Sequence, residues 1–155
     1  MHPFRGMSDH DQKQIRALCD GVASAIRTRN LDQMMSAYAE DVVQFDATGA
    51  LAQHGVTEVR ATTRAWFDGW EGSINFEMRD LTIDVTGDIA FAHSFNRSAG
   101  TTKQGRDVAM WVRWTACFRK RDGAWRVVHE HVSVPFDRET MKAELGLEPA
   151  RERRR

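Results

Sequence analysis

Two histidines, His129 and His131, stand two residues apart near the end of the chain. In an extended strand this spacing points both side chains to one face, which they share with Trp125, Val127 and Ser133. Imidazoles and a hydroxyl among apolar neighbours are typical of a strand that lines a cavity, and an imidazole can carry protons near neutral pH. We therefore expect this face to line a ligand site, with His131 as a proton carrier and His129 and Ser133 as ligand contacts.

A neighbouring strand is expected to pair with the histidine strand across a short Asp-Gly turn. The residues that share one face of this second strand are Trp111, Arg113, Thr115 and Cys117. If that face also lines the cavity, Arg113 can hold an anionic or carbonyl oxygen of the ligand, while Trp111 and Thr115 contact it. The alternative is a structural ion pair of Arg113 with Glu130 or Asp46.

Asp46 closes an apolar run that starts at Val42, and it precedes the turn sequence Ala47-Thr48-Gly49. A carboxylate at the mouth of an apolar hollow has a raised pKa, so that it can accept a proton bound to carbon. Asp46 is therefore the first candidate for a catalytic base, together with Arg113 and His131. The alternative is an Asx turn, in which the side chain only holds the hairpin.

The chain contains five tryptophans, more than a core of this size requires. An aromatic-lined cavity would explain this excess. The aromatic residues expected to contact a ligand in this region are Tyr38, Trp66, Phe67, Trp70 and Phe76. The alternative is that they only plug the open end of the fold.

Metal and cofactor chemistry have little support in the sequence. Histidines two apart on a strand have their side chains roughly 7 Å apart at the root, a spacing that can converge on zinc with Asp46 or His93 as a third ligand. No third ligand stands at a characteristic spacing from the pair, and we expect no metal and no other cofactor. The sequence also lacks a glycine-flanked serine nucleophile and a GxGxxG run after a strand.

Composition is typical of a single-domain globular protein. The 155 residues are 41% hydrophobic and 28% charged, and 22 basic side chains balance 22 acidic ones. A formal charge of zero provides no field that would attract nucleic acid or an anionic membrane. The amino-terminal MHPFRG lacks the apolar core of a signal peptide, so a cytoplasmic location is expected. Cys19 and Cys117 are expected to be small core residues rather than a disulfide.

Hydrophobic periodicity predicts helices first and long strands last. The expected helices cover residues 9–29, 31–38 and 56–67, and the expected strands cover 42–46, a short segment ending at 54–55, 74–85, 89–97, 108–120 and 124–134. Apolar side chains change parity near Arg79 and Asp80, which predicts a β-bulge that bends the sheet. The predicted fold is α+β, a cone-shaped, strongly bent antiparallel sheet wrapped around three helices.

Three stretches carry a resemblance to a known fold family. They are YAEDVVQFD over 38–46, the His54-Gly55 pair before a helix, and DGAWRVVHEHVSVP over 122–135. Together they resemble the nuclear transport factor 2-like (NTF2-like) superfamily, in its SnoaL-like and ketosteroid isomerase-like branch. The resemblance implies a cystatin-like roll. The implied parts are a disordered amino terminus (1–8), a SnoaL-like domain (9–137), and a C-terminal helix with a basic tail (138–155).

The resemblance to ketosteroid isomerases puts their general base on Asp46 without a gap. Their two oxyanion donors, a tyrosine of the first helix and a protonated acid on a late strand, fall on Val22 and near Val112 or Arg113, so both are missing. Because one such donor accounts for about a hundredfold in rate, steroid isomerisation is disfavoured. Some SnoaL-like members carry a similar Arg-x-Thr strand before His-x-His-x-Ser.

These features predict a small-molecule-binding protein or a cofactor-free acid-base enzyme of isomerase, cyclase or dehydratase type, which holds a mostly apolar ligand in the cone. The alternative is a non-catalytic dimerisation or association module of the same fold. A homodimer is expected, formed through the outer face of the sheet. The apolar residues expected on that face are Ile89, Phe91, Phe95, Trp114 and Phe118.

Overall fold

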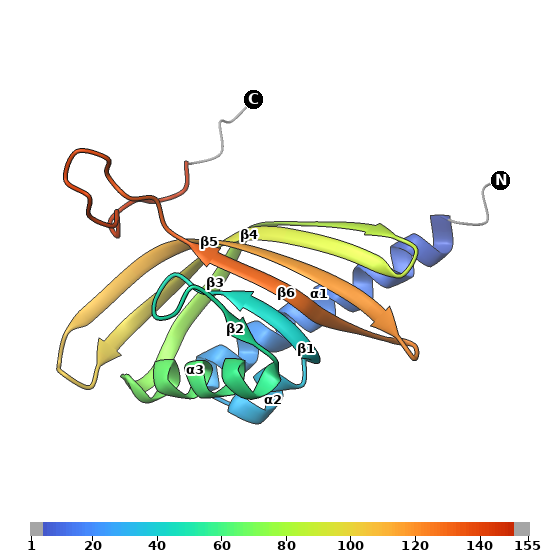
Figure 1. Ribbon diagram of the computed structural model, residues 1–155, viewed down its shortest axis with the longest axis horizontal. Helices are drawn as coiled ribbons and strands as arrows, with labels where there is room; N and C mark the ends of the chain where they lie inside the picture. Colours follow the sequence, from blue (N-terminus) through green and yellow to red (C-terminus); the bar gives the residue numbers. More distant parts are fainter. Residues whose placement is uncertain (1–4, 151–155) are drawn as a thin grey trace.

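Helices occupy the first part of the chain and long strands the second part (Figure 1). The computed structural model describes residues 5–150. The helices are α1 (Arg5–Thr28), α2 (Leu31–Met35) and α3 (Val56–Asp68). The strands are β1 (Tyr38–Phe45), β2 (Gln53–His54), β3 (Trp70–Thr86), β4 (Ile89–Thr102), β5 (Asp107–Arg121) and β6 (Ala124–Ser133). This order confirms the α+β prediction, although β1 and β3 each begin earlier than expected.

The six strands form one strongly bent sheet in the order β2-β1-β6-β5-β4-β3. β1 runs parallel to β6, whereas the other neighbours are antiparallel, so the sheet is mixed rather than wholly antiparallel. Parallel neighbours need a long connection, and here α3 and four strands separate β1 from β6 along the chain. The β1–β6 pairing therefore brings the first strand of the chain next to the last one.

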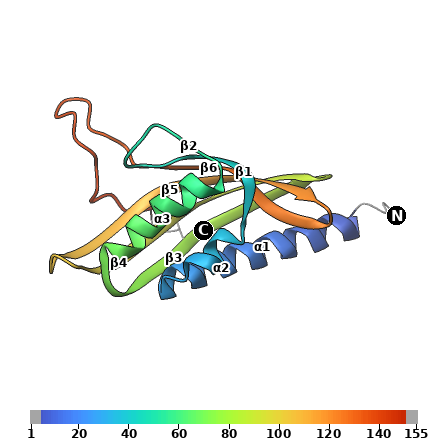
Figure 2. The same ribbon diagram turned by 60° about the horizontal axis from the view of Figure 1, so that its bottom comes forward.

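The helices cover one face of the sheet, which we call the inner face; the opposite face is the outer face. Figure 2 shows α1 running alongside β3, while α3 contacts β1 and β2. The buried side chains of α3 recur every fourth residue and are Val59, Thr63 and Phe67. On β4 and β5 the buried inner-face residues are Ala90, Ala92, Ser94, Asn96, Trp114, Ala116 and Phe118. The core therefore lies between the helices and the inner face.

A bulge in β3 contributes to the bend of the sheet. The register with β4 shifts between Arg79 and Thr82. Asp80 has a φ of 58° there, in the left-handed region. Bulges of this kind increase local twist and bend a strand. The bulge predicted from the parity change is confirmed.

A second bulge lies in β6. Cys117 pairs with His129 and Phe118 pairs with Val127, so Val128 has no partner on β5. One extra residue in a strand exchanges the faces of all side chains that follow it. The regular alternation assumed for this strand is therefore interrupted in its middle.

The amino-terminal end is more regular than expected. Residues 5–8 were expected to be disordered, but they form the first turn of α1. Residues 1–4 lie outside the described part of the chain. No helix over residues 5–150 is long and apolar enough to span a membrane.

The segment after β6 contains no helix over residues 138–150, where a C-terminal helix was expected. It forms turns, with an isolated bridge between Phe136 and Ala143. The Met141 N–H closes a single turn onto the Asp137 carbonyl at 2.7 Å. Met141 then has a φ of 58°, which ends the right-handed helical path. The expected basic tail, residues 151–155, lies outside the described residues.

Candidate functional site

Glu130 occupies the place on the inner face that the strand pattern assigned to the histidines. After the bulge at Val128, Glu130 points inward, as Trp125 and Val127 do before it. Only 5% of its surface is exposed. A carboxyl group at this depth needs hydrogen-bond partners, since an unpaired charge is costly to bury.

Two side chains of β1 hold both oxygens of Glu130. The Tyr38 hydroxyl donates to Oε2 over 2.5 Å, and Gln44 Nε2 donates to Oε1 over 2.9 Å. These contacts depend on the parallel pairing of β1 with β6, which sets Gln44 opposite Glu130. We call Tyr38, Gln44, Glu130 and the nearby Asp46 the inner polar group.

The environment of the inner polar group favours protonated forms. Burial raises the pKa of Glu130 and the Asp46 carboxylate raises it further, although hydrogen bonds from Tyr38, Gln44 and Trp114 lower it. The pKa of Tyr38 is raised well above its usual value, first by burial and then by Glu130. Glu130 therefore binds its proton more tightly than an exposed glutamate does.

Asp46 follows the last residue of β1 and is half-buried. Its Oδ1 accepts a hydrogen bond from the Ala47 N–H at 2.7 Å, as expected of a residue that holds a turn. Burial raises the pKa of Asp46, and the bond from Ala47 opposes that rise. A raised pKa is also required of a proton acceptor, so the turn contact does not exclude that role.

The aromatic residues expected to contact a ligand lie mostly within the core. The exposed fractions are 5% for Tyr38, 4% for Phe67, 6% for Trp70 and 4% for Phe76. Trp66 is half-buried, and its ring lies 5.4 Å from that of Phe67 with the planes tilted by 34°. Within this set, Trp66 offers the most surface to a ligand.

The two histidines expected in the site lie on the outer face instead. His131 is exposed, and its ring meets the edge of Phe45 with the centroids 5.5 Å apart. His129 Nδ1 lies 2.7 Å from the Val43 carbonyl oxygen, and its ring also contacts Phe45. These contacts fix the rings on the side of the sheet away from Glu130.

The second expected strand face also points outward. Arg113 is exposed, and its Nε donates to Ser133 Oγ over 3.1 Å rather than to a carboxylate. Thr115 is exposed and pairs with the histidine strand. The Arg79 guanidinium covers the ring of Trp111 at 4.5 Å from its centroid, a cation–π contact.

The expected convergence of Asp46, Arg113 and His131 on one site is therefore not found. Alternation predicted correctly which residues share a face in 111–117 and in 129–133, but both sets face outward. Trp114 and Phe118, expected on the outer face, are instead buried on the inner face. In the sequence, Glu130 alternates with Val128 and Val132, which indicated that this second face of β6 could also be buried. Only the bulge decides which of the two faces points inward.

The described residues offer no cluster for metal or thiol chemistry. Among the side chains that the structure describes, no three of histidine, cysteine or acidic type lie close enough to hold a metal ion. Cys19 is buried, and burial raises the pKa of its thiol to about 12. A thiol with such a pKa is unreactive at neutral pH.

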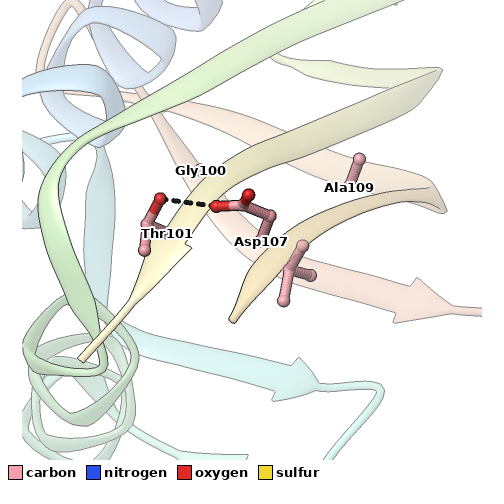
Figure 3. A pocket seen from close by; sticks show the side chains of 5 residues that line it. Gly100, Thr101, Asp107 and Ala109 are labelled. Atoms are coloured by element: carbon pink, nitrogen blue, oxygen red, sulfur yellow. Dashed lines mark hydrogen bonds between the residues drawn. The ribbon is translucent and has the colours of Figure 1, made fainter. Parts of the chain in front are cut away.

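Two open hollows lie elsewhere on the molecule. One of about 280 Å³ lies at the end of the β4–β5 hairpin and is lined by Gly100, Thr101, Asp107, Val108 and Ala109 (Figure 3). The Asp107 carboxylate there already accepts a hydrogen bond from Thr101 at 2.8 Å. The other hollow lies between α1 and α2. Neither contains a residue expected to contact a ligand, so the candidate site rests on the inner polar group.

Comparison with known proteins agrees with this architecture. The family model described as a SnoaL-like domain matches residues 15–137. A crystal structure of an NTF2-like protein of unknown function from Pseudomonas putida KT2440 has 34% sequence identity and a TM-score of 0.84, and the match covers 92% of this chain and 99% of that one. No curated protein matches the chain.

Two less similar structures share the fold alone. A ketosteroid isomerase-like protein from Erwinia carotovora atroseptica SCRI1043 has 20% identity and a TM-score of 0.67, over 78% of this chain and 93% of that one. The association domain of C. elegans CaMKII has 16% identity and a TM-score of 0.67, over 82% of this chain and 98% of that one. The same fold thus occurs in proteins described in quite different terms.

Proposed function

This chain belongs to the SnoaL-like domain family, and from that premise we propose that it binds a mostly apolar small molecule and moves a proton on it without a cofactor. The observation that carries this proposal is the buried carboxyl of Glu130, held by Tyr38 and Gln44 beside Asp46. A core built only for stability gains little from such a group, because an apolar residue of similar volume is often more stable there.

Asp46 is the proposed proton acceptor. It is half-buried, so a ligand can reach it, and burial raises its pKa toward the range useful for accepting a weakly acidic proton. Glu130 lies deeper, and its interaction with Asp46 couples the protonation of the two carboxyls. The proposal gives no step to Arg113 or His131, because both are exposed on the outer face.

Deuterium exchange tests the proposed chemistry. 4-Hydroxyphenylacetone carries C–H groups next to a carbonyl, and its deuterium uptake in heavy water is followed by NMR. We expect the protein to accelerate uptake and Asp46→Asn to lower the acceleration by about a hundredfold. His131→Ala, on the outer face, is the matched control and should keep full acceleration. Equal acceleration by wild type and Asp46→Asn would exclude Asp46 as the base.

A second candidate function, association with a second copy, is favoured by the outer face. Ile89, Phe91 and Phe95 lie on the outer face of β4, with His93 between the two phenylalanines, and are 55%, 47% and 37% exposed. An exposed row of large apolar side chains is typical of an interface. We propose that this row forms a homodimer contact, whether or not the inner face is catalytic.

Sedimentation at micromolar concentration tests the homodimer. Wild type should sediment as a dimer, and Phe91→Glu as a monomer, because a carboxylate at the centre of the row would be desolvated on association. Leu51→Glu is the control, since Leu51 is 97% exposed on a different segment. A wild-type monomer of 17.7 kDa would refute the contact.

A further inference from the structure

Two glutamines beside the inner polar group each leave a buried carbonyl oxygen without a partner. Gln44 of β1 and Gln53 of β2 are paired across the two strands and are 5% and 6% exposed. Among the described residues, neither Gln44 Oε1 nor Gln53 Oε1 receives a hydrogen bond. A buried polar atom without a partner destabilises the fold, so two such atoms side by side need an explanation.

The orientation of Gln44 is set by its neighbour. Its Nε2 donates to Glu130 Oε1 over 2.9 Å, which commits the amide nitrogen and leaves the amide oxygen free. Gln44 and Gln53 lie directly opposite each other in the antiparallel β1–β2 ladder, so their side chains are on the same face. The two free oxygens therefore belong to one region, close to Asp46 and Glu130.

The buried polar atoms left without a partner in this region are acceptors, namely the two amide oxygens. The carboxyl oxygens of Asp46 beside them also accept hydrogen bonds, while the cationic Arg113 expected here lies on the outer face. A ligand carboxylate or ketone would bring another hydrogen-bond acceptor next to these oxygens and leave them without a donor. A ligand N–H or O–H group would satisfy the free oxygens.

We propose that Gln44 and Gln53 form a subsite for a hydrogen-bond donor group, a hydroxyl or a protonated amine, carried by the mostly apolar ligand of the inner face. This inference rests on the proposed function and adds to it the polarity of the ligand. Asp46 stands beside this subsite and receives the proton of a carbon near the donor group, which keeps its own proton on the amide oxygens. Sites built to hydrogen-bond a substrate group discriminate strongly against analogues that lack it.

A matched set of single-ring fragments tests the subsite: toluene, phenol, benzylamine and benzoate. Dissociation constants come from NMR shifts of the Ala116 and Ala92 methyl groups on the inner face, because Ala116 pairs with Glu130 and Ala92 pairs with Ala116. Phenol or benzylamine should bind about tenfold or more tightly than toluene, and benzoate most weakly, because one hydrogen bond contributes about a factor of ten. The better of phenol and benzylamine identifies the donor as hydroxyl or ammonium.

Glutamine-to-methionine variants assign the preference to the two amide oxygens. Gln53→Met keeps the side-chain length and removes the acceptor, and it should reduce the preference over toluene to within about threefold. Gln44→Met should act in the same direction and provides a second test if one variant folds poorly. Gln33→Met, at an exposed glutamine of α2, should keep the full preference.

The outcomes separate this inference from the proposed function. If toluene or benzoate binds as tightly as phenol and benzylamine, the donor subsite is refuted while the inner-face site stands. A preference that survives in both Gln53→Met and Gln44→Met refutes the assignment to these oxygens. If no fragment shifts the inner-face methyl groups, both the subsite and the proposed binding function fail.

Discussion

Ionisable side chains are buried on one face of β6 and exposed on the other. On the inner face, Glu130 is 5% exposed and receives hydrogen bonds from two side chains of β1. On the outer face, His131 is exposed, and its ring packs nearly at right angles to the ring of Phe45. Adjacent residues of one strand thus belong to a buried polar group and to an exposed surface.

This difference comes from one extra residue rather than from composition. Without the bulge at Val128, the inward parity of Trp125 and Val127 would continue to His129 and His131. The bulge gives the inward place to Glu130 instead. Residue types identified the strand as chemically important, whereas its register decided which of its residues can do chemistry with Asp46.

Removing the carboxyl group of Glu130 should give the largest effect on stability. Glu130→Ala leaves a cavity and removes the acceptor for Tyr38 and Gln44, so we expect a loss of about 3 kcal/mol in the free energy of unfolding. His131→Ala, on the outer face, should cost under about 0.5 kcal/mol. Urea unfolding measures both, and similar losses for the two variants would erase the contrast between the faces.

Loss of a single hydroxyl should give a smaller effect of the same kind. Tyr38→Phe removes one donor to Glu130 and should cost about 1–2 kcal/mol. The pKa of Glu130 should rise, because the bond from Tyr38 lowers it in wild type. Ser133→Ala removes a hydroxyl bonded to Arg113 on the outer face and should change stability little. An unchanged Glu130 titration in Tyr38→Phe would contradict the assigned contact.

The stability of the protein should depend on pH through the protonation of Glu130 on the inner face. The folded-state pKa of Glu130 is raised above the ordinary value of 4.5, so between these two pKa values the folded protein binds more protons than the unfolded chain. The contribution of Glu130 to stability is then greatest below pH 4.5 and falls as pH rises through the raised pKa, at up to about 1.4 kcal/mol per pH unit. Glu130→Gln should flatten this fall in urea unfolding measured across that range.

Asp41, which carries an ion pair at the surface, supplies a control of opposite sign. A hydrogen bond from Arg121 lowers the pKa of Asp41 below 3.8. Its contribution is present above pH 3.8 and is lost as pH falls through the lowered pKa. Asp41→Asn should therefore lower stability slightly above pH 3.8 and leave it unchanged at more acid pH, so that only the acid side of the pH profile loses its slope. A fall with rising pH that persists unchanged in Glu130→Gln would show that another group causes it.

The smallest expected effect is an absence of coupling across the sheet. Asp46→Asn should leave the NMR shifts of the His131 ring unchanged at constant pH, because the two side chains are on opposite faces. The same substitution should lower the pKa of Glu130, since it removes a nearby negative charge. Large changes in the His131 ring shifts would place that ring near Asp46 and overturn the face assignment.

The sequence predicts the fold better than the site, for a physical reason. Helix and strand patterns depend on many residues, so the α+β order and the β3 bulge at Arg79 and Asp80 followed from apolar spacing alone. The site depends on the parity of one short strand, where HEHVS contains polar residues on both faces. The β3 bulge changes the parity of several apolar residues and was visible, whereas the Val128 bulge follows another valine, Val127, and the sequence does not reveal which residue is the extra one. The Tyr38–Glu130 contact further requires the parallel β1–β6 pairing, which no local pattern encodes.

The parallel ladder between β1 and β6 also determines when the site exists during folding. Tyr38 and Glu130 are 92 residues apart in sequence, so their contact closes a loop that comprises most of the domain. Closing so long a loop costs entropy before any contact compensates for it, whereas the β3–β4–β5–β6 hairpins can pair locally. We expect the hairpins to form first and β1 to dock last. Protection of the β1 amides against hydrogen exchange would then mark the moment at which a folding chain acquires a binding site.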